Sequence, residues 1–251
     1  MFFSSHALYS PNTKEAFRSA VIEKNRFEWR KKIPADAGKA IFLRDVQKQW
    51  YLEGINRNTD CIEKICNLIQ AETSGHEVIC VGSSAGGYIA TLVGTLIGAA
   101  RVFSFSGQFN LWPILKEKDG SDLNPVVSRN ANNPAISVYY SVPEFLARSQ
   151  TPVFYTYPTR SLQDTMQSGF VEKLMNVYSF KISSSKHDIA LYKENLTAFL
   201  QKDPNHLFRI YEVTKGKTIH PIEMSLRIQG ISQTLKIMMS KLRNRIRKGN
   251  A

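Results

Sequence analysis

Val78-Ile79-Cys80-Val81-Gly82-Ser83-Ser84-Ala85-Gly86-Gly87 is the stretch that decides the fold of this chain. Its first four residues form an apolar run of the length of a buried strand, and residues 85–96 are small and apolar over the length of a helix. The glycines between them permit a tight turn and a close approach of neighbouring backbone. The stretch therefore predicts a buried strand that passes directly into a helix, with Ser84 in the turn.

Outside this stretch, segments of strand length alternate with helical patterns. The alternation predicts βαβ units and the α/β class, with a mostly parallel central sheet and helices on both faces. We expect strands at residues 1–4, 39–43, 78–81, 101–105, 153–157, 177–182 and 210–213, and helices at residues 13–23, 60–71, 85–96 and 188–200.

The 251 residues suit one large α/β domain, or at most two small ones. The pattern loosens over residues 108–150, which are rich in turn formers and lie between two predicted core strands. We therefore expect a cap-like insertion over the site at 108–150. Residues 1–205 are assigned to the core domain, and residues 206–251 to a C-terminal extension that ends in a basic amphipathic helix.

The run Gly82-Ser83-Ser84-Ala85-Gly86 has the Gly-x-Ser-x-Gly pattern of a nucleophile elbow, which acquires meaning when a strand precedes it and a helix follows. Ser84 is then the predicted nucleophile. The N–H of Ala85, at the start of the helix, would face a developing oxyanion and gain from the helix dipole. The alternative is a glycine-rich turn that binds phosphate or only packs tightly, although the Gly-x-Gly-x-x-Gly spacing is absent.

A nucleophilic serine requires a base, and the chain has five histidines. His187 is the one that follows the last predicted core strand and precedes a predicted helix, which is where this fold places its base. We therefore predict His187 as the general base. The alternative is an exposed histidine in a loop.

The third member of the set should be a carboxylate that follows the preceding strand. Asp164 is the first carboxylate after residues 153–157, and the chain order serine, aspartate, histidine is then the order that the fold requires. Asp164 could instead cap the helix predicted to begin at Thr165. Asp45, which follows an earlier strand, is the alternative acid.

A second oxyanion donor is expected in the loop after an early strand. Residues 1–4 are the predicted strand, so the backbone N–H of Ser5 or of His6 would supply the donor. In this arrangement the chain begins near the middle of the sheet, and the first two strands of a full-length fold of this type are absent.

The strand order, the elbow, Asp164 and His187 together resemble the α/β-hydrolase superfamily over about residues 1–200. A narrower resemblance lies in Ile41-Phe42-Leu43-Arg44-Asp45, Trp50-Tyr51-Leu52-Glu53-Gly54 and Phe103-Ser104-Phe105-Ser106-Gly107-Gln108. These stretches are similar to α/β-hydrolase proteins of bacterial surface or capsular polysaccharide loci, some of which are thought to be O-acetyltransferases.

This resemblance implies a serine enzyme that forms an acyl-Ser84 intermediate on an acyl ester, with an esterase as the leading interpretation. Hydrolysis requires no cofactor, whereas an O-acetyltransferase would take acetyl from acetyl-CoA and give it to a saccharide hydroxyl. The superfamily also contains catalytically inactive members, so a non-catalytic module of a membrane-associated assembly is a further alternative.

The net charge of +12 suits an anionic substrate or surface, and it is uneven along the chain. Residues 236–251 contain six lysines and arginines and no acid. Over residues 221–248 the pattern predicts an amphipathic helix that would contact an anionic membrane surface or a membrane-bound partner. The alternative is a final helix packed on the core. No motif for nucleic acid is present. The apolar face is formed by Ile231, Leu235, Met238, Met239, Leu242 and Ile246.

The three cysteines, Cys61, Cys66 and Cys80, have neither metal-ligand nor redox-motif spacing, so no metal site is predicted. An odd cysteine count suits a reducing compartment. Polar Ser4, Ser5 and His6 follow Met1 too soon for a secretory signal, and no long uncharged apolar stretch predicts a membrane span. We expect a cytoplasmic protein, peripheral at the inner face of the membrane if the basic helix binds there.

Overall fold

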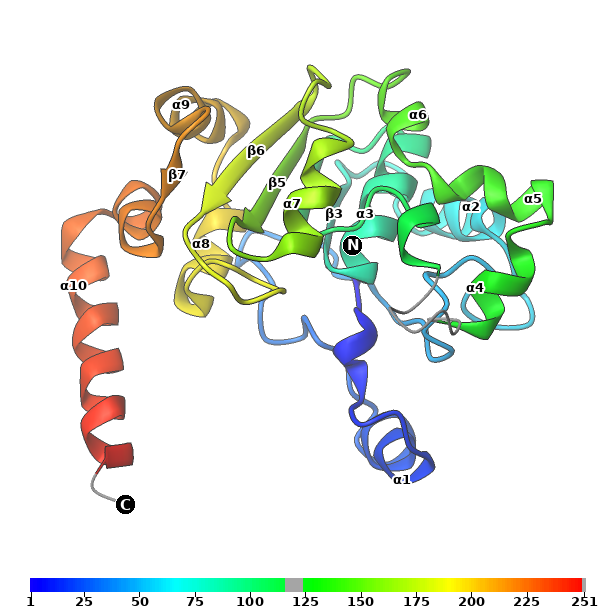
Figure 1. Ribbon diagram of the computed structural model, residues 1–251, viewed down its shortest axis with the longest axis horizontal. Coiled ribbons are helices and arrows are strands. Elements are labelled where there is room, and N and C mark those ends of the chain that lie inside the picture. Colours follow the sequence, from blue (N-terminus) through cyan, green and yellow to red (C-terminus); the bar gives the residue numbers. More distant parts are fainter. Residues whose placement is uncertain (116–123, 250–251) are drawn as a thin grey trace.

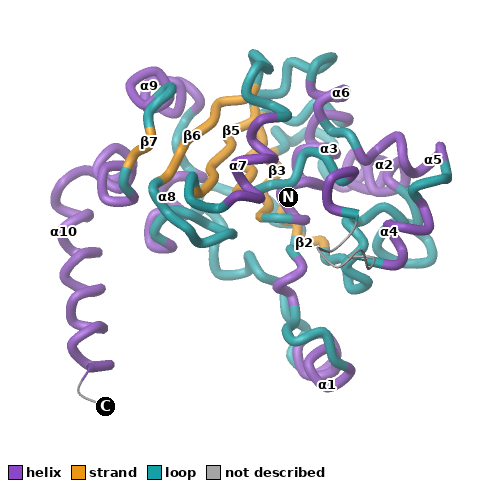
Figure 2. Tube along the Cα trace, viewed as in Figure 1, coloured by secondary structure: helices purple, strands orange, loops and turns teal. Residues whose placement is uncertain are grey.

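The computed structural model describes residues 1–115 and 124–249, with side chains as far as Arg243. Its centre is a seven-stranded sheet in the order β2-β1-β3-β4-β5-β6-β7, and every adjacent pair is parallel (Figures 1 and 2). The predicted α/β class is therefore confirmed. The strands are β1 (Phe2–Phe3), β2 (Phe42–Leu43), β3 (Ile79–Ser83), β4 (Arg101–Phe105), β5 (Val153–Pro158), β6 (Val177–Ile182) and β7 (Thr218–Ile219).

The first strand in the chain lies inside the sheet. Phe2 of β1 pairs with Phe42 of β2 on one side and with Val81 of β3 on the other. The strand order therefore reverses at β1, and all the strands end at the same edge of the sheet because they are parallel. Crevices at the carboxyl edge beside such a reversal are where open α/β sheets place their sites.

Successive side chains of a strand point to opposite faces of the sheet, so each face has apolar side chains to bury. Helices cover both faces. One core packs strand residues such as Val102 and Tyr155 against α2 and α3, and the other packs Phe103 and Phe154 against α8 and α9. The helices are α1 (Lys14–Phe17), α2 (Ile62–Glu72), α3 (Ala85–Leu96), α4 (Pro125–Asn130), α5 (Pro134–Ser137), α6 (Pro143–Leu146), α7 (Leu162–Gly169), α8 (Leu196–Leu200), α9 (Pro204–Thr214) and α10 (Pro221–Gly249).

The stretch predicted as an insertion, 108–150, carries α4, α5 and α6, and its residues 116–123 lie outside the described residues. Its described part packs against the elbow helix and the loop after β2. The Tyr88 hydroxyl on α3 donates to the Tyr139 carbonyl at 2.7 Å, and Arg129 forms an ion pair with Glu53 at 2.8 Å. These contacts attach the insertion to the core beside the carboxyl edge of the sheet.

The structure corrects two of the predicted elements. Residues 210–213 lie in α9, whose buried residues Leu207, Ile210 and Thr214 follow helical spacing after the N-cap Asp203. The seventh strand is instead β7, which pairs with the end of β6. The helix expected at 188–200 is regular over α8 only, with a short 3₁₀ segment at Lys193–Asn195 before it.

The predicted C-terminal helix corresponds to α10, which runs along the edge of the molecule (Figure 1). Its first residues belong to the core, where Met224 and Ile228 are buried. Gly230 interrupts the helix with φ +76° and ψ −179°, a conformation that glycine adopts without steric cost. Among the described residues, no helix combines the length and apolarity needed to cross a bilayer.

Candidate active site

The turn between β3 and α3 has a backbone conformation typical of a nucleophile elbow. Ser84 has φ +52° and ψ −122°, values that an L-residue adopts only under strain. The N–H of Ser84 donates to the Phe105 carbonyl at 2.9 Å, and the Ser84 carbonyl accepts from the Tyr88 N–H at 3.0 Å. A Cβ at Gly86 would lie 2.5 Å from the Phe3 carbonyl oxygen, so glycine is required where the turn meets β1.

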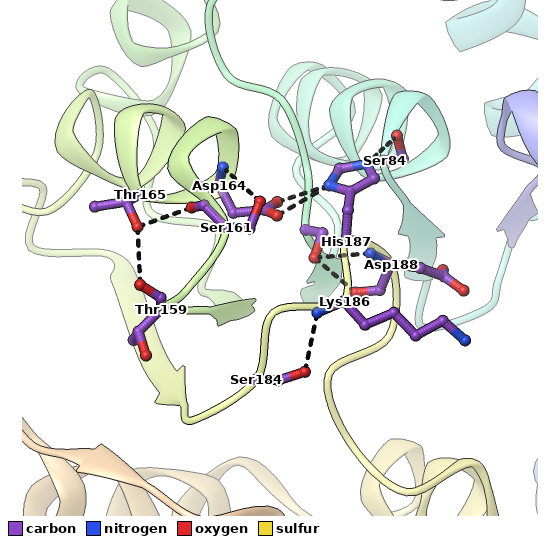
Figure 3. Close-up of polar contacts among 10 residues, drawn as sticks. Ser84, Thr159, Ser161, Asp164, Thr165, Ser184, Lys186, His187 and Asp188 are labelled. Carbon is purple, nitrogen blue, oxygen red and sulfur yellow. Dashed lines mark hydrogen bonds and ion pairs between the residues drawn. The ribbon is translucent and has the colours of Figure 1, made fainter.

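Three polar side chains meet in one hydrogen-bonded series at this turn (Figure 3). The Nε2 atom of His187 lies 2.9 Å from the Oγ of Ser84. The Nδ1 atom of the same ring lies 3.0 Å from each carboxylate oxygen of Asp164. The structure thus brings the predicted nucleophile, base and acid together, in the spatial sequence of a serine, histidine and aspartate triad.

Each of these residues comes from the carboxyl edge of a different strand. Ser84 follows β3, Asp164 lies in α7 after β5, and His187 lies in the loop after β6. The Asp164 side chain is 1% exposed, whereas that of His187 is 35% exposed, and Ser84 is half-buried. The Asp164 carboxylate is therefore shielded from water, whereas the side chains of Ser84 and His187 remain accessible.

Asp164 is not the N-cap of its helix. The cap of α7 is Ser161, whose Oγ accepts from the Asp164 N–H at 3.4 Å. The Asp164 carboxylate is consequently left for the imidazole. The hydrogen bond with Asp164 raises the pKa of His187 above its ordinary value, and burial acts against this effect.

The alternative acid, Asp45, has a different task. Its carboxylate oxygens accept from the backbone N–H groups of Gln47 at 3.0 Å, Gln49 at 2.6 Å and Tyr51 at 3.0 Å. Burial raises the pKa of Asp45 to about 6. Asp45 therefore organises the loop after β2, and the carboxylate in contact with His187 is that of Asp164.

Ser106, at the end of β4, holds the loop that carries His187. Its hydroxyl donates to the Asp188 carbonyl at 2.6 Å and accepts from the Asp188 N–H at 3.4 Å. Both residues have positive φ, +47° for Ser106 and +117° for Asp188. The value at Asp188 is incompatible with a right-handed helix, so the backbone directly after His187 is not helical. The sequence reasoning missed Ser106, although a serine one residue beyond a predicted strand is a usable signal.

Ala85 is the first residue of α3, so its N–H has no acceptor within the helix and lies at the positive end of the helix dipole. The loop that carries Ser5 lies beside it, because Gly86 is in close contact with Phe3 and Ser4. Both predicted oxyanion segments therefore lie at the elbow.

The N–H of Ser5 is engaged in this structure. It donates to the Glu28 carboxylate, and the Ser5 hydroxyl donates to the same group at 3.0 Å. Burial raises the pKa of Glu28, and the two bonds from Ser5 oppose that rise. Sequence reasoning missed Glu28, because it lies 23 residues along the chain from Ser5 with no motif to link them.

His6 follows Ser5 and begins a short 3₁₀ segment, so its own N–H has no acceptor within that segment. Its ring packs edge-to-face on Trp50, with 4.3 Å between the ring centres. Burial lowers the pKa of His6 to about 3, and its Nε2 is buried with no hydrogen-bond partner among the described residues. The His6 ring is therefore neutral near pH 7.

Within residues 1–115 and 124–249, no group of three or more metal-ligating side chains is assembled. A cavity of about 260 Å³ lies near the amino ends of β1 and β3, where Met1, Ile79 and Arg101 contribute to its lining. This cavity opens at the edge of the sheet opposite Ser84.

The chain has the architecture of the α/β-hydrolase class. Its parallel sheet places β1 between β2 and β3, its elbow serine follows β3, and a serine, an aspartate and a histidine follow one another in that order along the chain.

No protein-family model matches the chain, and no curated protein is significantly similar in sequence. A protein of unknown function from Staphylococcus aureus subsp. aureus Mu50 is 14% identical, with a TM-score of 0.45 over 61% of this chain and 71% of that one. The capsule O-acetyltransferase of Neisseria meningitidis serogroup A is 10% identical, with a TM-score of 0.49 over 74% and 80% of the two chains. An alpha/beta hydrolase enzyme from the metagenome of lagoon sediments at Mar Chica, Morocco, is 15% identical, with a TM-score of 0.35 over 61% and 69%.

Proposed function

We propose that this chain is a serine enzyme of acyl transfer that acts on an acyl ester through an acyl-Ser84 intermediate, with hydrolysis as its main outcome. The observation that carries the proposal is the series of contacts from Ser84 Oγ to His187 Nε2 and from His187 Nδ1 to Asp164. A half-exposed serine, an accessible histidine and a fully buried carboxylate have the exposures that this chemistry requires.

In the first half-reaction Ser84 Oγ attacks the carbonyl carbon of the ester, and His187 Nε2 takes the Oγ proton. Asp164 accepts from Nδ1–H, which selects the tautomer with a free Nε2 and stabilises the imidazolium as it forms. The tetrahedral intermediate then loses its alkoxide, which receives the proton from His187. The products of this step are an alcohol and the acyl-serine.

The tetrahedral intermediate carries a negative oxygen that must be stabilised. We assign one donor to the Ala85 N–H, at the positive end of α3. The second donor comes from the loop after β1, where the Ser5 N–H is held by Glu28 and the His6 N–H has no acceptor within its own turn. We therefore propose Ala85 and His6 as the resting pair, and Ser5 as a donor only after Glu28 releases it.

The second half-reaction determines the class of enzyme. Water, deprotonated by His187, attacks the acyl-serine and gives a carboxylic acid in an esterase, whereas a sugar hydroxyl would receive the acyl group in an O-acetyltransferase. In the second case acetyl-CoA would be the donor, and its thiol would leave in the first half-reaction. The net charge of +12 suits an anionic substrate in either case.

A fluorophosphonate probe tests the proposal directly. We expect labelling of the wild-type chain and none of Ser84→Ala, while the neighbouring Ser83→Ala variant is labelled as the wild type is. A folded wild-type chain that takes no label would contradict the proposal and favour a non-catalytic module. To separate the two outcomes, consumption of acetyl-CoA is followed with and without a polysaccharide acceptor, beside hydrolysis of p-nitrophenyl acetate.

A further inference from the structure

The part of α10 that follows Gly230 presents an apolar face to solvent. Five large side chains on this face are between 39% and 71% exposed. They recur at the i, i+4, i+7 and i+11 spacing that places residues on one side of a helix. In Figure 1 this part of α10 projects from the side of the molecule and ends beyond its body, away from the sheet. The apolar face comprises Ile231, Leu235, Met238, Met239 and Leu242.

A neighbouring face of the same helix is fixed to the body of the protein. The Thr234 hydroxyl lies 3.0 Å from that of Ser225, and Ile237 is buried. Lys241 lies 3.5 Å from Glu194, and its ammonium lies 4.4 Å from the centre of the Tyr192 ring. These contacts set the rotation of the helix, so the apolar face is held outward rather than free to turn inward.

The charged residues of α10 itself have one sign after Glu223. After Glu223 the sequence has no acidic residue as far as its end, and it has seven lysines and arginines. Lys236 and Arg243 are exposed and lie next to the apolar face on the helix, as the 100° rotation per residue requires. A second copy of α10 packed on this face would bring like charges together, and nucleic acid would leave the apolar side chains uncovered.

We infer that this face of α10 is a docking surface for an anionic lipid bilayer. The helix would lie in the plane of the interface, with the apolar face among the acyl chains and the flanking cations at the level of anionic headgroups. The apolar area and the positive charge would act together, because each alone gives only weak attachment. The docking is independent of the chemistry at Ser84, since α10 contributes nothing to that site.

The test is co-sedimentation of the full chain with two kinds of vesicle. One contains phosphatidylcholine alone, and the other also contains about 30% phosphatidylglycerol, which gives its surface a negative potential. The apolar variant is Leu235→Gln/Met239→Gln/Leu242→Gln, in which glutamine preserves helix propensity. Its matched control is Ile22→Gln/Met175→Gln/Val213→Gln. These three apolar side chains lie elsewhere on the surface, and each is at least 50% exposed.

The charge variant is Lys236→Glu/Arg243→Glu. Its control, Lys24→Glu/Lys173→Glu, changes the net charge by the same amount at exposed residues that are far from α10 in the sequence. We expect the wild type to partition at least about tenfold more onto the anionic vesicles, and each α10 variant to lose about tenfold or more while its control does not. Salt at 0.5 M, about three times physiological ionic strength, should weaken the partitioning.

Three results would overturn the inference. The first is a wild-type chain that does not sediment with anionic vesicles. The second is equal partitioning of the α10 variants and their controls. The third is a concentration-dependent dimer in light scattering that the glutamine variant abolishes, which would assign the apolar face to a second copy of the chain. Thermal unfolding of every variant confirms that each is folded, and none of these readouts depends on esterase activity.

Discussion

The Nε2 atom of His187 lies 2.9 Å from the Oγ of Ser84, although 103 residues separate them in the chain. The contact forms because β3 and β6 are parallel and end at the same edge of the sheet, so the turn after one faces the loop after the other. The predictions below concern the groups that hold this contact in place.

Replacing Asp164 should lower kcat far more than replacing Asp45, the alternative acid. In Asp164→Asn we expect kcat for p-nitrophenyl acetate to fall by about 10⁴-fold, because an amide can hold the imidazole in the wrong tautomer. In Asp45→Asn the loop after β2 loses a charged acceptor, so the melting temperature should fall while kcat stays within about threefold. The reverse ranking of the two kcat values would assign the acid to Asp45.

The pH dependence of turnover should follow His187. The base acts in its neutral form, so activity is lost as the pH falls through the pKa of the ring. Because the hydrogen bond with Asp164 raises that pKa above 6.5, the acidic limb of the rate profile should have its midpoint above 6.5. Removal of the charge in Asp164→Asn should shift the remaining limb to lower pH. A wild-type limb below 6.5 would mean that His187 is not held by Asp164 during turnover.

Ser106 should act as a positioning residue. In Ser106→Ala the loop beside His187 loses its 2.6 Å hydrogen bond to the Asp188 carbonyl. We expect kcat to fall by about tenfold with little change in KM, because misplacement of a base by a fraction of an ångström weakens proton transfer. Ser179→Ala is the control, since that buried hydroxyl has no hydrogen-bond partner within the described chain. Equal effects of both variants would reduce Ser106 to a packing role.

Glu28 should hold the loop that carries Ser5 and His6. In Glu28→Ala both donors of Ser5 lose their acceptor, and we expect a loss of about 1–3 kcal/mol in the free energy of unfolding, measured by urea titration, together with a lower kcat. Glu28→Gln keeps one acceptor oxygen and should recover part of both losses. A higher kcat in Glu28→Ala would instead show that release of the Ser5 N–H from the carboxylate outweighs the loss of order in the loop.

Parts of this fold and site could be predicted from local signals. The apolar run before Ser84, the glycines around it and the small residues after it are contiguous, so they predict the strand, the turn and the helix together. The places of Asp164 and His187 required only the order of strands along the chain. In contrast, a strand was wrongly predicted at residues 210–213, because the pattern of four residues does not distinguish an apolar strand from a segment of helix.

The groups that support the site could not be found in this way. Glu28 reaches Ser5, and Ser106 reaches Asp188, through hydrogen bonds between segments that no motif connects. Asp45 and Asp164 both follow strands and both carry a carboxylate, so only the partners of each carboxylate distinguish them. The outward direction of the apolar face of α10 likewise depends on the burial of Ile237 and on the contacts of Lys241 with Glu194 and Tyr192, which lie outside the helix.

The amino-acid sequence alone determined the α/β class, the elbow at Ser84 and the chain order of the three polar residues, because backbone propensity and the periodicity of apolar residues are local properties. The tertiary structure decided which carboxylate contacts His187, which loop donor is engaged by Glu28 and which face of α10 meets solvent. Each of these depends on distances between atoms that are far apart in the chain, and those distances exist only after the parallel strands have aligned at one edge of the sheet.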